Sequence, residues 1–303
     1  MAIHPLDRSH LRSRHRFTGT LVLDTALHIG GGREASTVTD SPIVRDGIGR
    51  PVIPGSSFKG AFRAGVERLV PNLPGFATCA LNRANPCLSM NEDLAEKYRM
   101  VSEAASRGLA LAVGEDVVAQ REREALRALR RGGWIGVELN AAHLLDLLAE
   151  YLCDTCKTFG SVHLASAARF HDLPVIEPWA ETTQIRDGVG IDRDSERAVE
   201  QIKFDYEIVP AQTKFTFSMT LENPTERDLG LIALGLQEFM EGMIPLGGIR
   251  SRGLGCCHLV DVQIAAVDFT QPRDLTVYLQ RGWPEANPIG DFITQHIAAL
   301  LPA

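Results

Sequence analysis

The pattern of apolar residues predicts strands in three segments of this chain, one of which has apolar residues at every second position. Residues 214–221 place Phe, Phe, Met and Leu on alternate positions. Residues 17–25 and 254–264 combine β-branched with apolar side chains, a composition typical of strands. Two shorter apolar runs, 42–44 and 51–53, flank an Asp-Gly pair and predict a tight hairpin.

Two other segments carry their apolar residues at helical spacing. Apolar side chains recur at intervals of three or four over residues 58–69, and we expect Ser56 or Ser57 to cap this helix. Residues 228–243 predict a second amphipathic helix. Because each helix has one apolar face, both should pack on a common core.

The pattern changes between residues 71 and 153, where we expect an insertion into a smaller core. Prolines and cysteines open an irregular stretch, and residues 92–131 are charged and alanine-rich, which predicts helix. Residues 134–139 predict a strand, and residues 141–152 predict a further helix.

Residues 181–209 predict a long protruding hairpin with a charged tip at 194–200. The elements then follow the order strand, hairpin, helix, insertion, hairpin, strand, helix, strand. That order fits an α+β fold with a ferredoxin-like βαββαβ core. We expect this core over residues 17–70 and 154–265, with a C-terminal extension at 266–303.

Composition narrows the class of protein. The chain has 303 residues, 45% of them hydrophobic, which suits one large domain or a domain with an insertion. It has neither a run of 18 apolar residues nor the apolar segment of a secretory signal, so we expect a cytoplasmic protein without a membrane partner. The net charge of −7 argues against a free-standing nucleic-acid binder, yet residues 41–70 hold five basic and two acidic residues, a local charge of +3.

Two glycine-rich loops, 27–32 and 245–255, carry the clearest chemical signal. Glycine lets the backbone approach a ligand closely, and successive N–H groups in such turns can bind anions. Basic residues stand beside both loops, and Ser56 and Ser57 lie where a helix start would add further N–H groups. We interpret the two loops as a surface that follows a polyanionic backbone.

Five ordered blocks resemble the RAMP superfamily of CRISPR effector proteins, and most closely the repeated backbone subunit of type III (Csm/Cmr) complexes. The blocks are 27–31, 40–46, 53–60, 191–193 and 247–255. The resemblance implies an RRM-like palm that holds CRISPR RNA (crRNA), with neighbouring copies forming a filament. The implied partners are crRNA, complementary single-stranded target RNA, other RAMP subunits, and the large and small subunits of the complex.

The resemblance also implies that the hairpin at 181–209 is a thumb that interrupts the guide–target duplex. In this sequence Val189 and Ile191 are the residues that we expect to wedge against a base. The implied catalytic residue is Asp40, which would cleave target RNA by transesterification through the ribose 2′-OH with a divalent cation such as Mg²⁺. On the residues alone, a turn or N-cap aspartate is the favoured reading of Asp40, and only the surrounding family blocks favour catalysis.

Polar and glycine residues of the matching blocks are candidates for RNA binding. A solvated helix face is the alternative for the basic residues among them, and a structural role is the alternative for the histidine. The candidates are His28, Gly30, Gly31, Ser56, Ser57, Lys59, Arg63, Gly247, Gly248, Arg250, Ser251 and Arg252.

Cys79, Cys87, Cys153 and Cys156 supply four thiols in the pattern of a structural zinc site. The alternative is four ordinary cysteines, because the first pair is loosely spaced. Four protein ligands would leave no open position, so this zinc would hold the insertion to the palm and take no part in catalysis.

Two other functions remain open at this point. Complexes of this kind also contain RAMP subunits that bind crRNA and cleave nothing. A guide-processing RAMP endonuclease fits less well, because such enzymes usually rely on a histidine-centred site.

Overall fold

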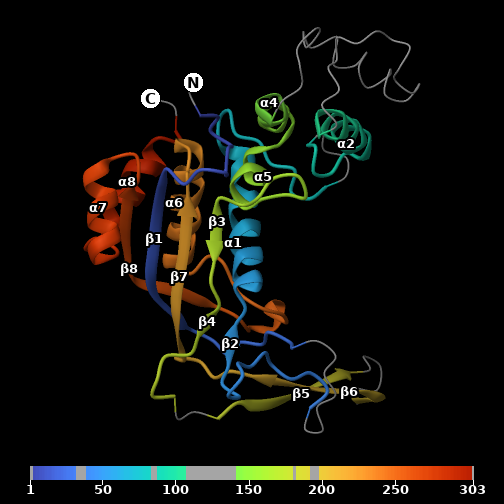
Figure 1. Cartoon of the computed structure of the whole chain (residues 1–303). Coiled ribbons are helices and arrows are strands. Elements are labelled where there is room, and N and C mark those ends of the chain that lie inside the picture. Colours follow the sequence, from blue (N-terminus) through green and yellow to red (C-terminus); the bar gives the residue numbers. More distant parts are fainter. Residues whose placement is uncertain are drawn as a thin grey trace.

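The computed structural model describes residues 3–31, 39–82, 87–106, 141–179, 182–191 and 198–301 (Figure 1). Its centre is a five-stranded sheet in which every pair of neighbours is antiparallel. In spatial order the strands are β3 (Ala168–Phe170), β7 (Lys214–Glu222), β1 (Ser13–Leu23), β8 (Cys257–Asp268) and β9 (Asn287–Pro288).

The sheet has one buried and one partly exposed face, as the alternating sequence predicts. Phe215, Phe217, Met219 and Leu221 of β7 are fully buried, while the residues between them are exposed or half-buried. The three predicted strands are therefore confirmed, with ends shifted by a few residues.

Helices cover the buried face of the sheet. α1 (Gly55–Leu69) and α6 (Glu226–Met240) pack together through the stacked rings of Phe58 and Phe239, whose centroids are 4.5 Å apart. Phe58 also contacts Phe217 of β7, which joins both helices to the sheet. The apolar stripes predicted for these two helices thus form one core.

The start of α1 differs from the prediction. The N-cap residue is Pro54, whose own side chain makes no capping hydrogen bond, and Ser56 and Ser57 lie within the first turn of the helix. The Gly55 N–H instead donates to the Asp172 carboxylate at 2.7 Å. The expectation that a serine caps this helix was wrong, because the acceptor comes from a residue 117 positions away.

The described part of the chain after α1 gathers at one end of that helix (Figure 1). It contains η1 (Val70–Asn72), α2 (Glu92–Ser106) and α4 (Ala141–Tyr151), and α5 (Asp154–Phe159) follows directly. These helices confirm the predicted helix at 141–152 and the first part of the one at 92–131. The rest of that helix and the strand expected at 134–139 lie outside the described residues.

The predicted hairpin is present. β5 (Gln184–Ile191) and β6 (Ala198–Ile208) form a separate antiparallel pair, at the end of the molecule opposite α2 and α4 (Figure 1). A second small sheet pairs β2 (Val52–Ile53) with β4 (Leu173–Pro174). Residues 194–197 of the charged tip lie outside the described part of the chain.

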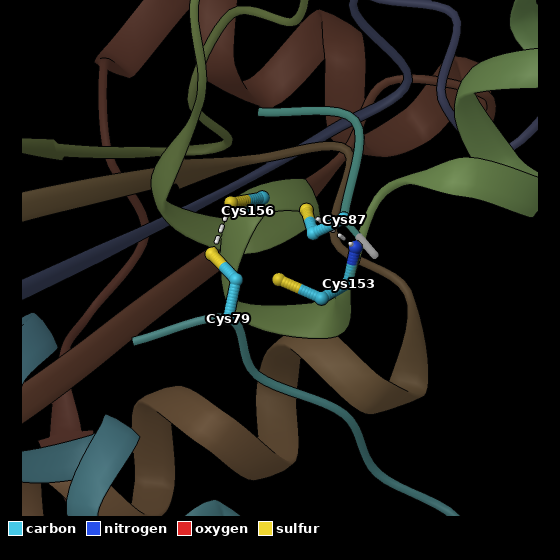
Figure 2. Close-up of side chains that lie close together, drawn as sticks. All are labelled: Cys79, Cys87, Cys153 and Cys156. Atoms are coloured by element: carbon cyan, nitrogen blue, oxygen red, sulfur yellow. Dashed lines mark hydrogen bonds between the residues drawn. The ribbon is translucent and has the colours of Figure 1, made fainter. Parts of the chain in front are cut away.

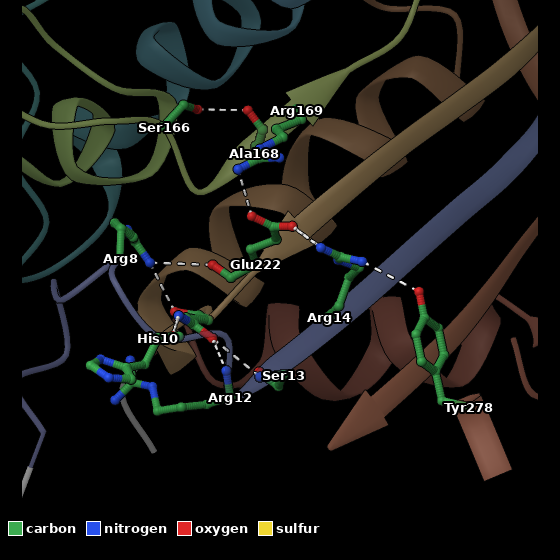
Figure 3. Close-up of polar contacts among 11 residues, drawn as sticks. Arg8, His10, Arg12, Ser13, Arg14, Ser166, Ala168, Arg169, Glu222 and Tyr278 are labelled. Carbon is green, nitrogen blue, oxygen red and sulfur yellow. Dashed lines mark hydrogen bonds and ion pairs between the residues drawn. The ribbon is translucent and has the colours of Figure 1, made fainter. Parts of the chain in front are cut away.

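Polar contacts fasten the N-terminal segment to the end of β7 (Figure 3). Glu222 forms ion pairs with Arg14 at 2.6 Å and Arg169 at 2.7 Å, and its carbonyl oxygen accepts a hydrogen bond from Arg8. Arg14 also donates to the hydroxyl of Tyr278 in α7 (Pro272–Arg281). Arg8 and Arg14 thus join the N-terminal segment to β7, and Arg14 also joins it to α7.

α8 (Gly290–Ala298) follows α7 and packs beside α6. None of the helices within the described ranges combines the length and apolar character needed to span a bilayer.

Candidate functional site

The two glycine-rich loops contact each other directly, although they lie far apart in the sequence. The Gly248 N–H donates to the His28 carbonyl oxygen at 2.9 Å, and the Gly255 N–H donates to that of Ala26 at 2.9 Å. Gly247 has a φ of +74°, and a Cβ there would stand 2.3 Å from the His28 carbonyl oxygen. Only glycine allows this close approach, so the two loops form one surface.

Some of the glycine N–H groups hold this surface together. The Gly31 N–H donates to the Pro42 carbonyl oxygen at 2.9 Å, and Gly30 forms a bridge with Ile43. With the Gly248 N–H also occupied, these backbone donors serve the structure of the loops. The N–H groups of Gly31 and Gly248 are therefore not available to an anion at this surface.

His28 is buried and points into the protein. Its Nδ1 lies 2.6 Å from the Glu207 carbonyl oxygen, so Nδ1 carries the proton, and Nε2 lies 3.3 Å from the Ser41 hydroxyl. Its ring also meets Tyr206 edge-on at 5.6 Å. His28 therefore joins the first loop to β6 and to the residue after Asp40, which corresponds to the structural alternative considered for it.

Asp40 is exposed, and its position is fixed by a second aspartate. The Asp205 carboxylate accepts hydrogen bonds from the Asp40 N–H at 2.6 Å and from the Thr39 hydroxyl at 2.7 Å. In return the Asp40 carboxylate accepts from the Asp205 N–H at 3.2 Å. Sequence analysis missed Asp205, although strand alternation places it on the same side of β6 as Glu207.

Glu207 fastens the next part of the loop to the same strand. Its carboxylate accepts the Ile43 N–H at 3.0 Å, pairs with Arg45 and accepts the Thr183 hydroxyl. Burial opposes the ionisation of Glu207, but these hydrogen bonds and the Arg45 charge outweigh it and lower the pKa of the carboxyl. The loop that carries Asp40 is therefore held to the hairpin by Asp205 and Glu207, two residues on the same side of β6.

The two basic residues predicted to share a face of α1 have different surroundings. Lys59 is half-buried, and burial followed by the Arg63 charge lowers its pKa; no acceptor among the described residues bonds its ammonium group. Arg63 pairs with Glu67 at 2.8 Å and donates to the Gly160 carbonyl oxygen at 3.1 Å and to Cys156 Sγ at 3.4 Å. Arg63 thus joins α1 to α5. Of these two residues, Lys59 is the one whose charged group could contact a ligand.

The second loop presents its basic residues to solvent. Arg250, Ser251 and Arg252 form the short helix η2 and are all exposed. The Arg252 guanidinium lies 5.9 Å from the centre of the Phe204 ring on β6.

The two residues predicted to wedge against a base, Val189 and Ile191, belong to β5, but their side chains lie outside the described part of the chain.

The four predicted cysteines meet in the interior (Figure 2). All are buried, and their sulfur atoms lie within 4.8 Å of one another. Cys153 caps the N-terminus of α5 and Cys156 lies one turn later, while Cys79 and Cys87 come from the loops after α1. A tetrahedral zinc with bonds of about 2.3 Å needs sulfurs about 3.8 Å apart, and Cys79 and Cys156 are separated by 3.6 Å.

The chemistry of this cluster also suits a cation. Burial raises the pKa of Cys79 to about 11, whereas hydrogen bonds from the Cys153 and Cys156 thiols lower the pKa of Cys87. Metals bind the thiolate form of cysteine, so a lowered pKa at Cys87 favours metal binding. The Arg63 guanidinium, which donates to Cys156 Sγ, supplies the outer hydrogen bond that such ligands usually receive. The four cysteines could therefore hold a metal ion.

The RAMP superfamily profile matches residues 20–258. This chain belongs to the RAMP superfamily. The resemblance drawn from the five ordered blocks is confirmed, and the mixed α+β architecture with its central antiparallel sheet is consistent with that family.

Three relatives carry the name CRISPR system Cms endoribonuclease Csm3. The protein from Methanocaldococcus jannaschii is 45% identical over 60 residues, which is 19% of this chain and 24% of that protein. The protein from Enterococcus italicus is 46% identical over 66 residues, 21% of this chain and 31% of that protein. The protein from Methanothermobacter thermautotrophicus is 34% identical over 73 residues. The chain thus matches less than a third of the length of each relative.

Proposed function

We propose that this chain is a backbone subunit of a type III CRISPR effector complex, which binds crRNA and cleaves complementary target RNA. Membership of the RAMP superfamily and the name endoribonuclease in three relatives support this function. The observation that carries it is the exposed Asp40, held by Asp205 where the glycine loops meet the hairpin.

The fold is organised as this function requires. The connections β1–α1–β3–β7–α6–β8 and the sheet order β3-β7-β1-β8 correspond to a ferredoxin-like core, which we assign as the palm over residues 17–70 and 154–265. The hairpin at 181–209 is the thumb, and residues 71–153 are an insertion. Residues 266–303 form the C-terminal extension.

RNA lies along the joined glycine loops in this proposal. Lys59, Arg250 and Arg252 contact its phosphates, because these cations face solvent or lack a described partner. Ser56 and Ser57 add hydroxyl groups at the start of α1. Arg63 and His28 are assigned supporting roles, since their side chains are engaged inside the protein.

Cleavage is an attack of a ribose 2′-oxygen on the adjacent phosphorus. The P–O bond to the following nucleotide breaks, leaving a 2′,3′-cyclic phosphate and a 5′-hydroxyl. Asp40 orients the attacking 2′-hydroxyl and accepts its proton, and a proton from solvent completes the 5′-hydroxyl of the leaving strand. A divalent cation such as Mg²⁺, when bound beside Asp40, would neutralise charge on the phosphate.

A structural zinc bound by Cys79, Cys87, Cys153 and Cys156 completes the proposal. It would hold the start and end of the insertion against α5, and through Arg63 against α1. The other partners are further RAMP subunits and the large and small subunits of the complex, together with crRNA and single-stranded target RNA.

Reconstitution of the effector complex tests this function. The complex is assembled with a defined crRNA and mixed with end-labelled complementary RNA and Mg²⁺. Cuts at regular intervals within the paired region are the expected result. A complex that retains crRNA and target but leaves every site uncut would instead favour a subunit that only binds RNA.

A further inference from the structure

One aromatic ring of the hairpin is exposed beside the second glycine loop. The side chains of β6 alternate, so Phe204 and Tyr206 point to one side while Asp205 and Glu207 hold the Asp40 loop on the other. Phe204 is 36% exposed, whereas Tyr206 is buried. The two rings are inclined by 28° with centroids 6.0 Å apart, so the buried Tyr206 ring lies beside the exposed Phe204 ring.

The orientation of the Phe204 ring follows from the glycine opposite it. Gly188 pairs with Phe204 across the hairpin, and a Cβ built there would stand 2.3 Å from Cζ and 2.7 Å from both Cε atoms. These three distances place that Cβ above the face of the ring rather than at its edge. One face of Phe204 therefore rests on the Gly188 backbone, and the opposite face points away from the hairpin.

A cation stands beside this ring. The Arg252 guanidinium lies 5.9 Å from the ring centre, within the range of a cation–π contact, and Arg250 and Ser251 next to it are exposed. No ion pair engages Arg252 in the part of the chain that is described. Hairpin and loop thus present a flat apolar surface with positive charge beside it.

We infer that Phe204 is a stacking platform for one nucleobase of the bound RNA, with Arg252 covering the base from the other side. The inference rests on the proposed RNA binding and adds a subsite to it. Every base offers a π face to an aromatic ring, and its phosphate suits the neighbouring arginines. Glycine at position 188 is required because any side chain there would lift the ring off the strand.

The separation between the Phe204 ring and the Arg252 guanidinium is close to what a nucleobase between them needs. A planar base with contacts of about 3.5 Å on each side needs about 7 Å between ring and guanidinium. The present 5.9 Å separation requires the exposed Arg252 side chain to move by about 1 Å. Arg252 therefore already lies close to the position from which it would cover the base.

Fluorescence of 2-aminopurine tests the platform. The reconstituted complex is prepared with 2-aminopurine at successive single positions, first in the crRNA and then in the target. In the wild type, at least one position should be quenched on binding. Phe204→Leu should abolish that quenching and weaken RNA affinity by about 5- to 150-fold, the range for loss of one stacked base. Phe204→Tyr should restore both.

A matched control is available on the same chain. Trp283 is also covered by an arginine, Arg16, whose guanidinium lies 4.6 Å from the ring, but it belongs to the C-terminal extension. Trp283→Leu should change neither quenching nor affinity, and thermal unfolding of each variant checks that the fold is intact.

The outcomes separate this inference from the proposed function. If wild type binds RNA and a correctly folded Phe204→Leu binds it with unchanged affinity and quenching, the platform is wrong and the proposed function stands. If the wild-type complex binds neither crRNA nor target, both are wrong. The labelled strand that shows the quenching identifies whether guide or target supplies the base.

Discussion

Asp205 and Asp40 each bind the backbone of the other. The Asp205 carboxylate accepts the Asp40 N–H at 2.6 Å, and the Asp40 carboxylate accepts the Asp205 N–H at 3.2 Å. Because Asp205 lies on β6, the proposed catalytic carboxylate is anchored to the hairpin that we propose as the thumb. A thumb displaced by the guide–target duplex would carry Asp40 along.

Removal of the Asp205 side chain should slow cleavage without weakening target binding. Asp205→Ala frees the loop at Asp40, and a small misplacement of a reacting group costs about 10²-fold in rate. Asp205→Asn should retain most activity, since an amide oxygen can accept the same two bonds. Single-turnover cleavage at saturating target measures the effect.

Asp187 supplies the control for this change. It faces Asp205 across the hairpin, so Asp187→Ala removes an equal charge and leaves the two bonds of Asp205 in place. Wild-type cleavage by Asp205→Ala would contradict the positioning role. Equal losses in the Asn and Ala variants would indicate that the negative charge of Asp205 matters rather than its bonds.

The Glu207 clamp should make stability depend on pH. The pKa of Glu207 is lowered in the folded protein, so its carboxylate contributes stability above the unfolded value of about 4.3 and loses that contribution as pH falls through the lower folded value. Glu207→Gln should cost about 1.5–3 kcal/mol at pH 7, the range for a hydrogen bond to a charged group.

Urea unfolding at pH 7 and near pH 3 measures this difference. The gap in unfolding free energy between wild type and Glu207→Gln should narrow at the lower pH. A gap that is the same at both pH values would show that the ionisation of Glu207 does not contribute to stability.

Metal analysis tests the cysteine cluster. The purified chain should contain about one zinc, and Cys153→Ser should lose the metal and destabilise the insertion, because binding free energy is folding free energy in such sites. Cys256 is exposed and lies outside the cluster, so Cys256→Ser should retain both metal and stability. If the purified protein contains no metal and adding zinc does not change its stability, the proposed zinc site is wrong.

Lys59 and Arg63 should respond differently to substitution by alanine. Lys59→Ala should weaken binding of any RNA sequence and reduce the slope of log affinity against log salt by about 0.7, with unchanged stability. Arg63→Ala should lower stability, since it leaves Glu67 and the Gly160 carbonyl oxygen without their partner. Salt titrations and thermal unfolding distinguish them, and a reversed pattern would refute the assignment.

The sequence was sufficient where structure depends on local periodicity. Alternation specified the strand at Phe215–Leu221, and the glycines, whose backbone demands are local, marked the loop surface. It was insufficient where a partner comes from a distant segment. Asp172 caps α1, and Asp205 lies 165 residues from Asp40, so neither contact leaves a local pattern. Arg63 illustrates the same limit, because its burial depends on α5 folding against α1.

The measurement that tests the central claim most directly is target cleavage by a complex carrying Asp40→Ala. Asp40 is exposed and lies outside every strand and helix, so its removal should leave folding, crRNA retention and target binding intact. Cleavage at the sites occupied by this subunit should fall by about 10²–10⁴-fold, the usual contribution of a positioned acid–base group. Cleavage at the wild-type rate by a correctly assembled Asp40→Ala complex would contradict the account and move the chemistry to another residue.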